Sequence, residues 1–293
     1  MKKILVSLCA VSALGASAAF AVLPQPAEFV PQKHGQCYTA EELFERNSEN
    51  AGGGQGTLHG EFAFRREQAL ENDAIKEIGW MTLKPGAYIG THAHNDNEDA
   101  YLIISGKGVF TDGEGNAYVV GPGDMTIARP GQSHGLANLF KEDLVFLDII
   151  AKNAASDLDA IKANPTPQMF ARKDLFDRNS EKAGGGKGIG TLLGKFAFRR
   201  EQATKDQAIK EIGLMTLKKG NSIGLHPHTN NDDTYIIISG NGVFTGTDGK
   251  DIAVGPRSVT IAGPGEMHAL RNDGEEDLVF IDLIAQDHAL KVE

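Results

Sequence analysis

Short runs of apolar residues, each closed by Gly, Pro, Asn or Asp, fill the chain between residues 57 and 150. Runs of this length suit strands better than helices, which need longer periodic segments. The strands predicted in this way cover residues 62–64, 75–83, 101–104, 109–110, 118–120, 125–127 and 144–150. Many short strands with close turn signals indicate an all-β sandwich or barrel.

The same pattern returns in the second half of the chain. Residues 62–68 read FAFRREQ, and so do residues 196–202. From there the offset stays at 134 residues up to residues 278–280. A repeat of this length indicates the duplication of a whole domain, because solenoid repeats are much shorter. We therefore expect two copies of one all-β domain, over residues 57–151 and 191–285.

The flanking segments do not follow the strand pattern. Residues 22–56 read as a Pro-rich lead-in followed by a short helix, since Thr39 and Glu42 have capping-box spacing. Residues 152–190 read as a linker with a helix over residues 157–163, capped by Ser156. Residues 286–293 form a tail.

Two Gly-rich loops, residues 52–56 and 184–188, precede the first strand of each copy. A phosphate-binding loop would place Ser or Thr after its lysine and then begin a helix. Lys187 is followed by glycine and no helix signal, so the pattern fails. We expect both loops to be flexible entries to the first strand.

The amino terminus resembles a secretory signal peptide of the bacterial type. Lys2 and Lys3 precede an apolar run, and Ala19-Phe20-Ala21 is an A-x-A cleavage pattern. This predicts removal of residues 1–21 and export to the periplasm or beyond the cell. No later segment approaches the ~20 apolar residues that cross a membrane, so membrane insertion is not expected.

Charge and cysteine content narrow the class of protein further. The chain has 29 basic and 39 acidic residues, a net charge of −10. Cleavage after Ala21 removes two lysines and brings this charge to −12, which argues against a nucleic-acid partner. Only Cys37 remains after cleavage, so no internal disulfide is expected.

A histidine and carboxylate pattern predicts a metal site in the first copy. His92 and His94 are two residues apart, which places both imidazoles on one face of a strand. Asp99 opens the next predicted strand, and His134 follows a Pro-Gly turn into another. Imidazoles and a carboxylate brought together in this way suit a borderline divalent metal.

The second copy keeps these residues in register, as His226, His228, Asp233 and His268. The spacings G-x5-H-x-H-x4-D-x6-G and G-x2-H-x3-N therefore occur twice, and they resemble the two motifs of the cupin superfamily. The resemblance covers residues 57–151 and 191–285 and implies a bicupin. It further implies two small antiparallel barrels, jelly-roll-like double-stranded β-helices, with a metal held inside each.

The ligands that the resemblance implies are His92, His94, Asp99 and His134, with His226, His228, Asp233 and His268 in the second copy. The family's usual glutamate is aspartate here, and Glu98 and Asp232 stand one residue earlier as alternative carboxylate ligands. Up to two divalent metals per chain are expected, and Mn, Fe, Ni, Cu and Zn all suit such a donor set.

Fold alone does not fix a reaction, because cupins include decarboxylases, dioxygenases, isomerases and binding proteins. The first hypothesis is an exported metalloenzyme that acts on a small molecule bearing carboxylate or hydroxyl groups. The alternative is a non-catalytic protein that binds metal or a small ligand. Homo-oligomerisation is left open.

Two further groups of residues bear on this choice. Tyr101 and Tyr235 share a strand face with the predicted carboxylate ligands, so they are the candidate catalytic residues, as ligand-orienting or acid–base groups. The pairs 65–66 and 199–200 are arginines that either bind a carboxylate substrate or form surface salt bridges with Glu67 and Glu201.

Overall fold

The computed structural model describes residues 35–153, 157–163 and 166–287. All of them belong to one compact unit, Pro31–Glu293. The predicted signal peptide, the end of the tail and Ser156 lie outside the described residues. None of the described helices has the length and apolar character needed to span a bilayer.

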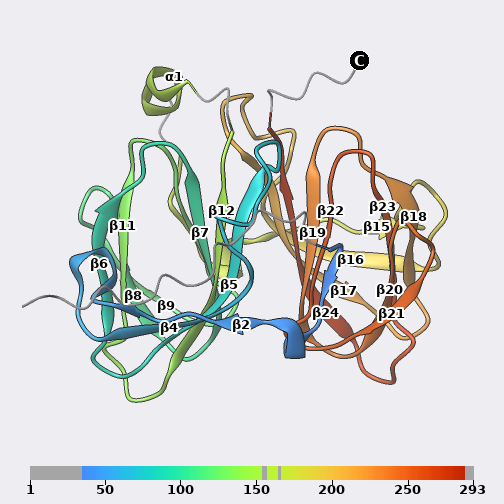
Figure 1. The fold of residues 1–293 in the computed structure, drawn as a ribbon, viewed down its shortest axis with the longest axis horizontal. Coiled ribbons are helices and arrows are strands. Elements are labelled where there is room, and N and C mark those ends of the chain that lie inside the picture. Colours follow the sequence, from blue (N-terminus) through green and yellow to red (C-terminus); the bar gives the residue numbers. More distant parts are fainter. Residues whose placement is uncertain (1–34, 154–156, 164–165, 288–293) are drawn as a thin grey trace, which may run out of the picture. The chain divides into compact units, whose positions relative to one another are not determined.

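Each half of this unit is built from nine main strands (Figure 1). In the first half they are β4 Thr57–Phe64, β5 Ile75–Leu83, β6 Tyr88–Ala93, β7 Glu98–Ser105, β8 Gly108–Thr111, β9 Ala117–Val120, β10 Met125–Ala128, β11 Ser133–Ala137 and β12 Leu144–Ala151. In the second they are β16 Thr191–Phe198, β17 Ile209–Leu217, β18 Ser222–Pro227, β19 Asp232–Ser239, β20 Gly242–Thr245, β21 Asp251–Val254, β22 Val259–Ala262, β23 Met267–Arg271 and β24 Leu278–Ala285.

The strands of each half form one larger and one smaller antiparallel sheet. Four short strands take part as well: β1 Cys37–Tyr38, β2 Phe44–Glu45, β13 Met169–Phe170 and β14 Phe176–Asp177. In the first half the orders are β13-β10-β7-β12-β5-β4-β2 and β6-β11-β8-β9, and in the second they are β1-β22-β19-β24-β17-β16-β14 and β18-β23-β20-β21. The prediction of two all-β domains with the same arrangement of strands is confirmed. The two sheets of a half are not hydrogen-bonded to each other along their edges. "Barrel" therefore means here two sheets around one interior.

The segments before the barrels contain only short elements. The strands are β1 Cys37–Tyr38, β2 Phe44–Glu45, β3 Ser48–Glu49, β13 Met169–Phe170, β14 Phe176–Asp177 and β15 Ser180–Glu181. The helices are the 3-10 turns η1 Ala40–Glu42, η2 Ala51–Gly53 and η3 Arg172–Asp174, and the α-helix α1 Leu158–Ala163. The predicted helix after Thr39 is thus a single 3-10 turn, because Leu43 already returns to extended backbone.

The two barrels exchange short strands. β1, which precedes the first barrel, pairs with β22 of the second barrel. β13, which precedes the second barrel, pairs with β10 of the first. Each larger sheet therefore ends on a short strand from the segment that precedes the other barrel in the sequence.

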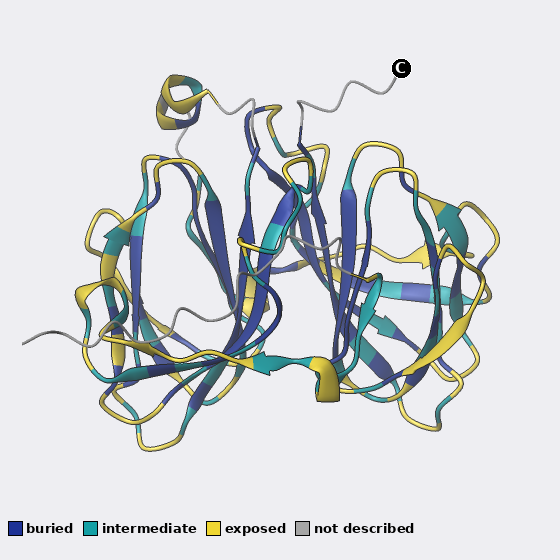
Figure 2. Cartoon of the chain, viewed as in Figure 1, coloured by how far each residue is buried: buried dark blue, intermediate teal, exposed yellow. Residues whose placement is uncertain are grey.

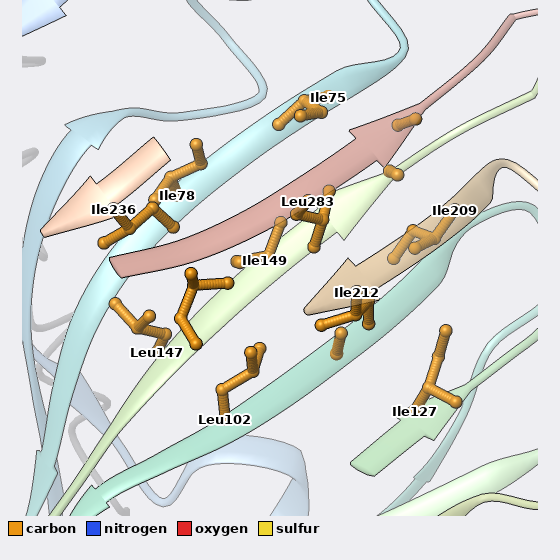
Figure 3. Close-up of a cluster of buried hydrophobic side chains, with 14 of the residues drawn as sticks. Ile75, Ile78, Leu102, Ile127, Leu147, Ile149, Ile209, Ile212, Ile236 and Leu283 are labelled. Carbon is orange, nitrogen blue, oxygen red and sulfur yellow. The ribbon is translucent and has the colours of Figure 1, made fainter. Parts of the chain in front are cut away.

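Three apolar cores stabilise this arrangement. One fills the interior of the first barrel around Phe110 and Phe146, and another fills the second barrel around Phe244 and Phe280. The third combines residues of both barrels, including those labelled in Figure 3. Figure 2 shows that the strands of the two larger sheets are mostly buried, whereas the loops that connect the strands are mostly exposed. The shared core buries the outer faces of both large sheets, and the inner faces are left to build the sites.

Candidate metal centres

The predicted ligands of the first copy come together inside the first barrel. The Nε2 atoms of His92, His94 and His134 lie 4.0, 3.6 and 3.3 Å from Oδ2 of Asp99. β6 supplies His92, β7 supplies Asp99 and β11 supplies His134, while His94 follows directly on β6. One ligand atom from each residue fits within a span of 4.8 Å.

The second barrel repeats the cluster. The corresponding distances from Oδ2 of Asp233 are 3.9 Å to His226, 3.6 Å to His228 and 3.4 Å to His268. These four residues again lie within 4.8 Å of one another. The two clusters therefore offer the same donor set in nearly the same geometry.

Hydrogen bonds on the far side of the imidazoles turn their Nε2 atoms inward. His92 donates from Nδ1 to the carbonyl oxygen of Gly90 at 3.0 Å, and His226 donates in the same way to Gly224 at 2.9 Å. Nδ1 of His94 lies 2.8 Å from Oδ1 of Asn97. A proton fixed on Nδ1 leaves the Nε2 lone pair free for a metal.

The donor set fits a divalent transition metal. Nε2 of His94 and Nε2 of His134 face each other at 3.1 Å, and Oδ1 of Asp99 has no hydrogen-bond partner among the described residues. Burial, together with the neighbouring imidazole of His134, lowers the pKa of His94 to about 4, so this imidazole is neutral at pH 7. Neutral imidazoles and a carboxylate are the ligands that Mn, Fe, Co, Ni, Cu and Zn accept.

The alternative carboxylates, Glu98 and Asp232, point away from the imidazoles. The carboxylate of Glu98 accepts hydrogen bonds from the backbone of residues 208–209, and that of Asp232 from residues 74–75. Each therefore binds the opposite barrel and lies outside the clusters. Strand alternation explains this, because neighbouring residues of β7 and β19 face opposite sides of the sheet.

Tyr101 and Tyr235 lie beside the clusters with almost no exposed surface. The ring of Tyr101 stacks on His134 at 4.4 Å between centroids, and that of Tyr235 stacks on His268 at 4.5 Å. Burial raises the pKa of both hydroxyls well above their ordinary value. They are therefore protonated at neutral pH and can donate a hydrogen bond or a proton.

Sequence reasoning missed four buried carboxyl groups beside the clusters, namely Glu77, Asp148, Glu211 and Asp282. Asp148 on β12 pairs in register with Tyr101 and adjoins Asp99. Glu77 on β5 binds the side chains of both neighbouring arginines. A charged residue within an apolar strand was the available signal, since charges are rarely buried without a partner.

The arginine pairs lie at the clusters and not only on the surface. Nε of Arg65 lies 3.2 Å from Glu77, and Nε of Arg66 lies 3.5 Å from the same oxygen. In the second barrel, Arg199 and Arg200 make the equivalent contacts with Glu211 at 3.1 and 3.6 Å. The expected surface pairs also occur, at 3.7 Å for Arg65–Glu67 and 3.4 Å for Arg199–Glu201.

The Gly-rich loops differ from the flexible entries that we expected. η2 packs on β6, where Gln55 and Tyr88 exchange two backbone hydrogen bonds. A Cβ on Gly54 would lie 2.0 Å from the carbonyl oxygen of Tyr88, and one on Gly52 would lie 3.0 Å from Nδ1 of His92. Glycine is needed here for close approach to the strand that carries the ligands, so the loop is part of the wall of the site.

A cavity of about 130 Å³ adjoins the second cluster. Its walls include His226, Asp233, Tyr235 and the arginine pair, together with Gly184 of the Gly-rich loop. One water needs about 10–15 Å³ on this measure, so the space holds several waters or one small organic molecule.

All sixteen residues that line this cavity have an identical counterpart in the first half of the chain. Elsewhere the halves have diverged. At the shared core, for instance, Trp80 corresponds to Leu214, and in a turn outside that core Gly123 corresponds to Arg257. The positions that surround the two clusters therefore carry the same residues in both halves.

Comparison with known proteins identifies the fold of both halves. The family model described as "Cupin domain" matches residues 79–150 and 213–284. An oxalate-binding protein of Thermotoga maritima is 31% identical over 116 residues, which are 40% of this chain and 93% of that protein. That relative thus corresponds to a single barrel.

Two solved structures match both barrels together. The oxalate decarboxylase of Lactobacillus farciminis, in a formate complex, is 17% identical, covers 89% of each chain and has a TM-score of 0.61. The oxalate decarboxylase of Bacillus subtilis, which has Mn(II) centres, is 19% identical with a TM-score of 0.56, over 90% of this chain and 80% of that one. At these identities the match shows the shared bicupin fold.

Proposed function

The chain belongs to the cupin family, and we propose that each of its two barrels holds a divalent transition metal and uses it to act on a small dicarboxylate of the oxalate type. The observation that carries the proposal is a cluster of three imidazoles and one carboxylate that reaches, through His226 and Asp233, a small cavity with an arginine pair in its wall. The 31% identical oxalate-binding protein supports the same ligand class.

The arginine pair is the reason why we propose an anionic ligand. A bound metal carries two positive charges, and the wall of the cavity in the second barrel adds Arg199, Arg200 and a third arginine, Arg178. Guanidinium groups match carboxylates in bidentate fashion. A dicarboxylate can therefore bind the metal with one end and the arginines with the other.

The size of the cavity suits a small ligand. With about 130 Å³ lined by side chains such as Phe196, Met215 and Ile223, it accommodates a two- or three-carbon acid. The metal would polarise the bound carboxylate and weaken the adjoining C–C bond.

Decarboxylation of oxalate breaks that C–C bond, releases carbon dioxide and places a proton on the carbon that remains as formate. In the first barrel, Tyr101 and Asp148 are the groups beside the ligands that can carry such a proton. We propose them as the proton donors of a lyase.

A second candidate is reversible binding of the dicarboxylate without turnover. It is favoured by the relative from Thermotoga maritima, which is named an oxalate-binding protein. Assay of the Mn²⁺-loaded protein with oxalate decides between the two candidates. Formate and carbon dioxide in equal amounts support the lyase. Saturable binding without product supports the binding protein. Absence of both product and binding would overturn the dicarboxylate proposal.

We further propose that the protein is exported, with residues 1–21 removed as a signal peptide. The support is the sequence Lys2-Lys3, the apolar run and the A-x-A pattern. Amino-terminal sequencing of the protein from a bacterial periplasmic fraction should begin at Val22. An intact Met1 on protein confined to the cytoplasm would contradict export.

A further inference from the structure

Each barrel binds the other through one buried carboxylate. Oε1 and Oε2 of Glu98 accept hydrogen bonds from the backbone N–H groups of residues 208–209, at 2.8 and 3.0 Å. In return, Oδ2 of Asp232 accepts from residues 74–75 at 2.7 and 2.8 Å. Both side chains are buried, with 1% and 2% of their surface exposed. We call Glu98 and Asp232 the interbarrel carboxylates.

Each interbarrel carboxylate directly precedes a predicted metal ligand. Glu98 is followed on β7 by Asp99, and Asp232 is followed on β19 by Asp233. Because side chains alternate along a strand, one residue faces the cluster and its neighbour faces the other barrel. Any ordering of the ligand by a metal therefore acts on the residue that binds the opposite barrel.

The far end of the contact leads to the arginine pair of the other site. The N–H groups bound by Glu98 lie at the start of β17, and Glu211 follows on the same strand. Glu211 binds both Arg199 and Arg200. The reciprocal contact of Asp232 leads along β5 to Glu77 and the first arginine pair. Figure 3 labels Ile209 of β17 in the apolar core shared by both barrels.

We propose that the two centres are coupled crosswise: metal bound by the ligands of one barrel orders the arginine pair of the other barrel through the interbarrel carboxylate. The coupling is reciprocal, as linkage requires, so a ligand on the arginines of one site also tightens metal in the other. The statement about the arginine pair rests on the proposed function. The effect of metal on the opposite strand does not.

The two interbarrel contacts, one made by Glu98 and the other by Asp232, are not equally reinforced. Beside Glu98 lies Arg129, with Nε at 3.7 Å and its guanidinium 5.1 Å from the ring of Phe198 in the second barrel. The position that corresponds to Arg129 in the second copy is Gly263. A buried cation that contacts both barrels adds stiffness to the Glu98 contact. We expect the first centre to act on the second barrel more strongly than the reverse.

Hydrogen–deuterium exchange of the full chain tests the coupling with Mn²⁺ as the probe. His226→Ala/His268→Ala removes metal binding from the second barrel, so Mn²⁺ can bind only the first. Mn²⁺ should then slow exchange of the backbone N–H groups at residues 208–211 by about fivefold or more, because coupling energies start near 1 kcal/mol.

Two variants in this background separate coupling from structure. Glu98→Gln removes the charge and one acceptor and should still bind Mn²⁺, but the response at residues 208–211 should disappear. Asp143→Asn, which changes an exposed carboxylate paired with Lys84, should keep the response. Should Glu98→Gln fail to fold, the mirror experiment uses His92→Ala/His134→Ala with Asp232→Asn, read at residues 74–77.

Mn²⁺ binding without any change at residues 208–211, or an equal change in Glu98→Gln, would overturn the coupling. Oxalate binding is measured separately by calorimetry. A Mn²⁺ response without oxalate binding would reject the proposed ligand but keep the coupling between the metal and the opposite barrel. Oxalate binding without the Mn²⁺ response would reject the coupling but keep the proposed ligand.

Discussion

Arg200 lies in the cavity wall with 57% of its side chain exposed, anchored by Glu211 at 3.6 Å. Arg66 has the equivalent contact with Glu77 in the first barrel. In each of these arginines the glutamate holds Nε in place, and the other N–H groups of the guanidinium remain to donate hydrogen bonds to an anion. At the scale of single residues, these side chains are expected to decide whether an anion binds.

The variant Arg66→Gln/Arg200→Gln should weaken oxalate binding by about ten- to hundredfold, since hydrogen bonds to charged groups contribute about 1.5–3 kcal/mol. Its metal content should stay that of the wild type. Lys84→Gln, which alters a surface lysine paired with Asp143, is the control with unchanged affinity. Calorimetric titration with oxalate measures both, and equal affinity in all three proteins would exclude the arginines from binding.

Cys37 is predicted to be an unreactive thiol. Burial, with a smaller contribution from the charge of Glu42, raises its pKa to about 12. An ordinary thiol has a pKa of about 8.5, so at pH 8 the thiolate fraction of Cys37 is about a thousandfold lower. Labelling by a thiol reagent should be correspondingly slow and should accelerate about tenfold per pH unit towards pH 12. Denatured protein, labelled quickly, is the control. Labelling of folded protein at the denatured rate would contradict the burial of the thiol.

At the scale of elements, η2 is expected to depend on glycine in a position-specific way. A Cβ on Gly54 would collide with the carbonyl oxygen of Tyr88, whereas one on Gly53 meets nothing within 4 Å, although its φ is +76°. Gly53→Ala should cost only the ~1–2 kcal/mol of a left-handed L-residue. Gly54→Ala should cost more and lower metal affinity as well. Urea unfolding and metal titration check this, and equal effects of the two variants would refute the close packing.

The shared core offers a matched pair of variants. Trp80 is buried in it, while its counterpart Leu214 lines a cavity of about 170 Å³ between the halves. Trp80→Leu should lower the free energy of unfolding by about 1–3 kcal/mol, because large-to-small changes in a core leave unfilled space. Leu214→Trp has space to enter and should cost less. A larger loss for Leu214→Trp than for Trp80→Leu would contradict this reading of the core.

At the scale of the whole molecule, the sequence predicted the fold well because the chain contains the same pattern twice. The spacing of His92, His94, Asp99 and His134 recurs in register, and this repeat, together with its resemblance to the cupin motifs, predicted which side chains meet. Strand alternation was enough to place side chains two residues apart, such as His92 and His94, on a common face. It could not decide between Asp99 and Glu98, because that choice depends on which face of β7 meets the other barrel.

The remaining features depend on contacts between distant parts of the chain. The partners of Glu98 lie 110 and 111 residues away in the second barrel, and nothing near Glu98 in the sequence reports them. Glu77 and Asp148 look like isolated charges in apolar strands until the sheets are paired. The first Gly-rich loop is held in a defined conformation by its packing on β6. Its glycine-rich composition suggests flexibility and gives no sign of that packing.

The central claim is that the chain carries two equivalent metal centres, and metal analysis of the purified protein tests it most directly. After loading with Mn²⁺ and removal of unbound ions, the wild type should hold two metals per chain. His134→Ala and His268→Ala should each hold one, because each removes a fully buried ligand from one cluster. The double variant should hold none. Two metals per chain in the double variant would contradict the account.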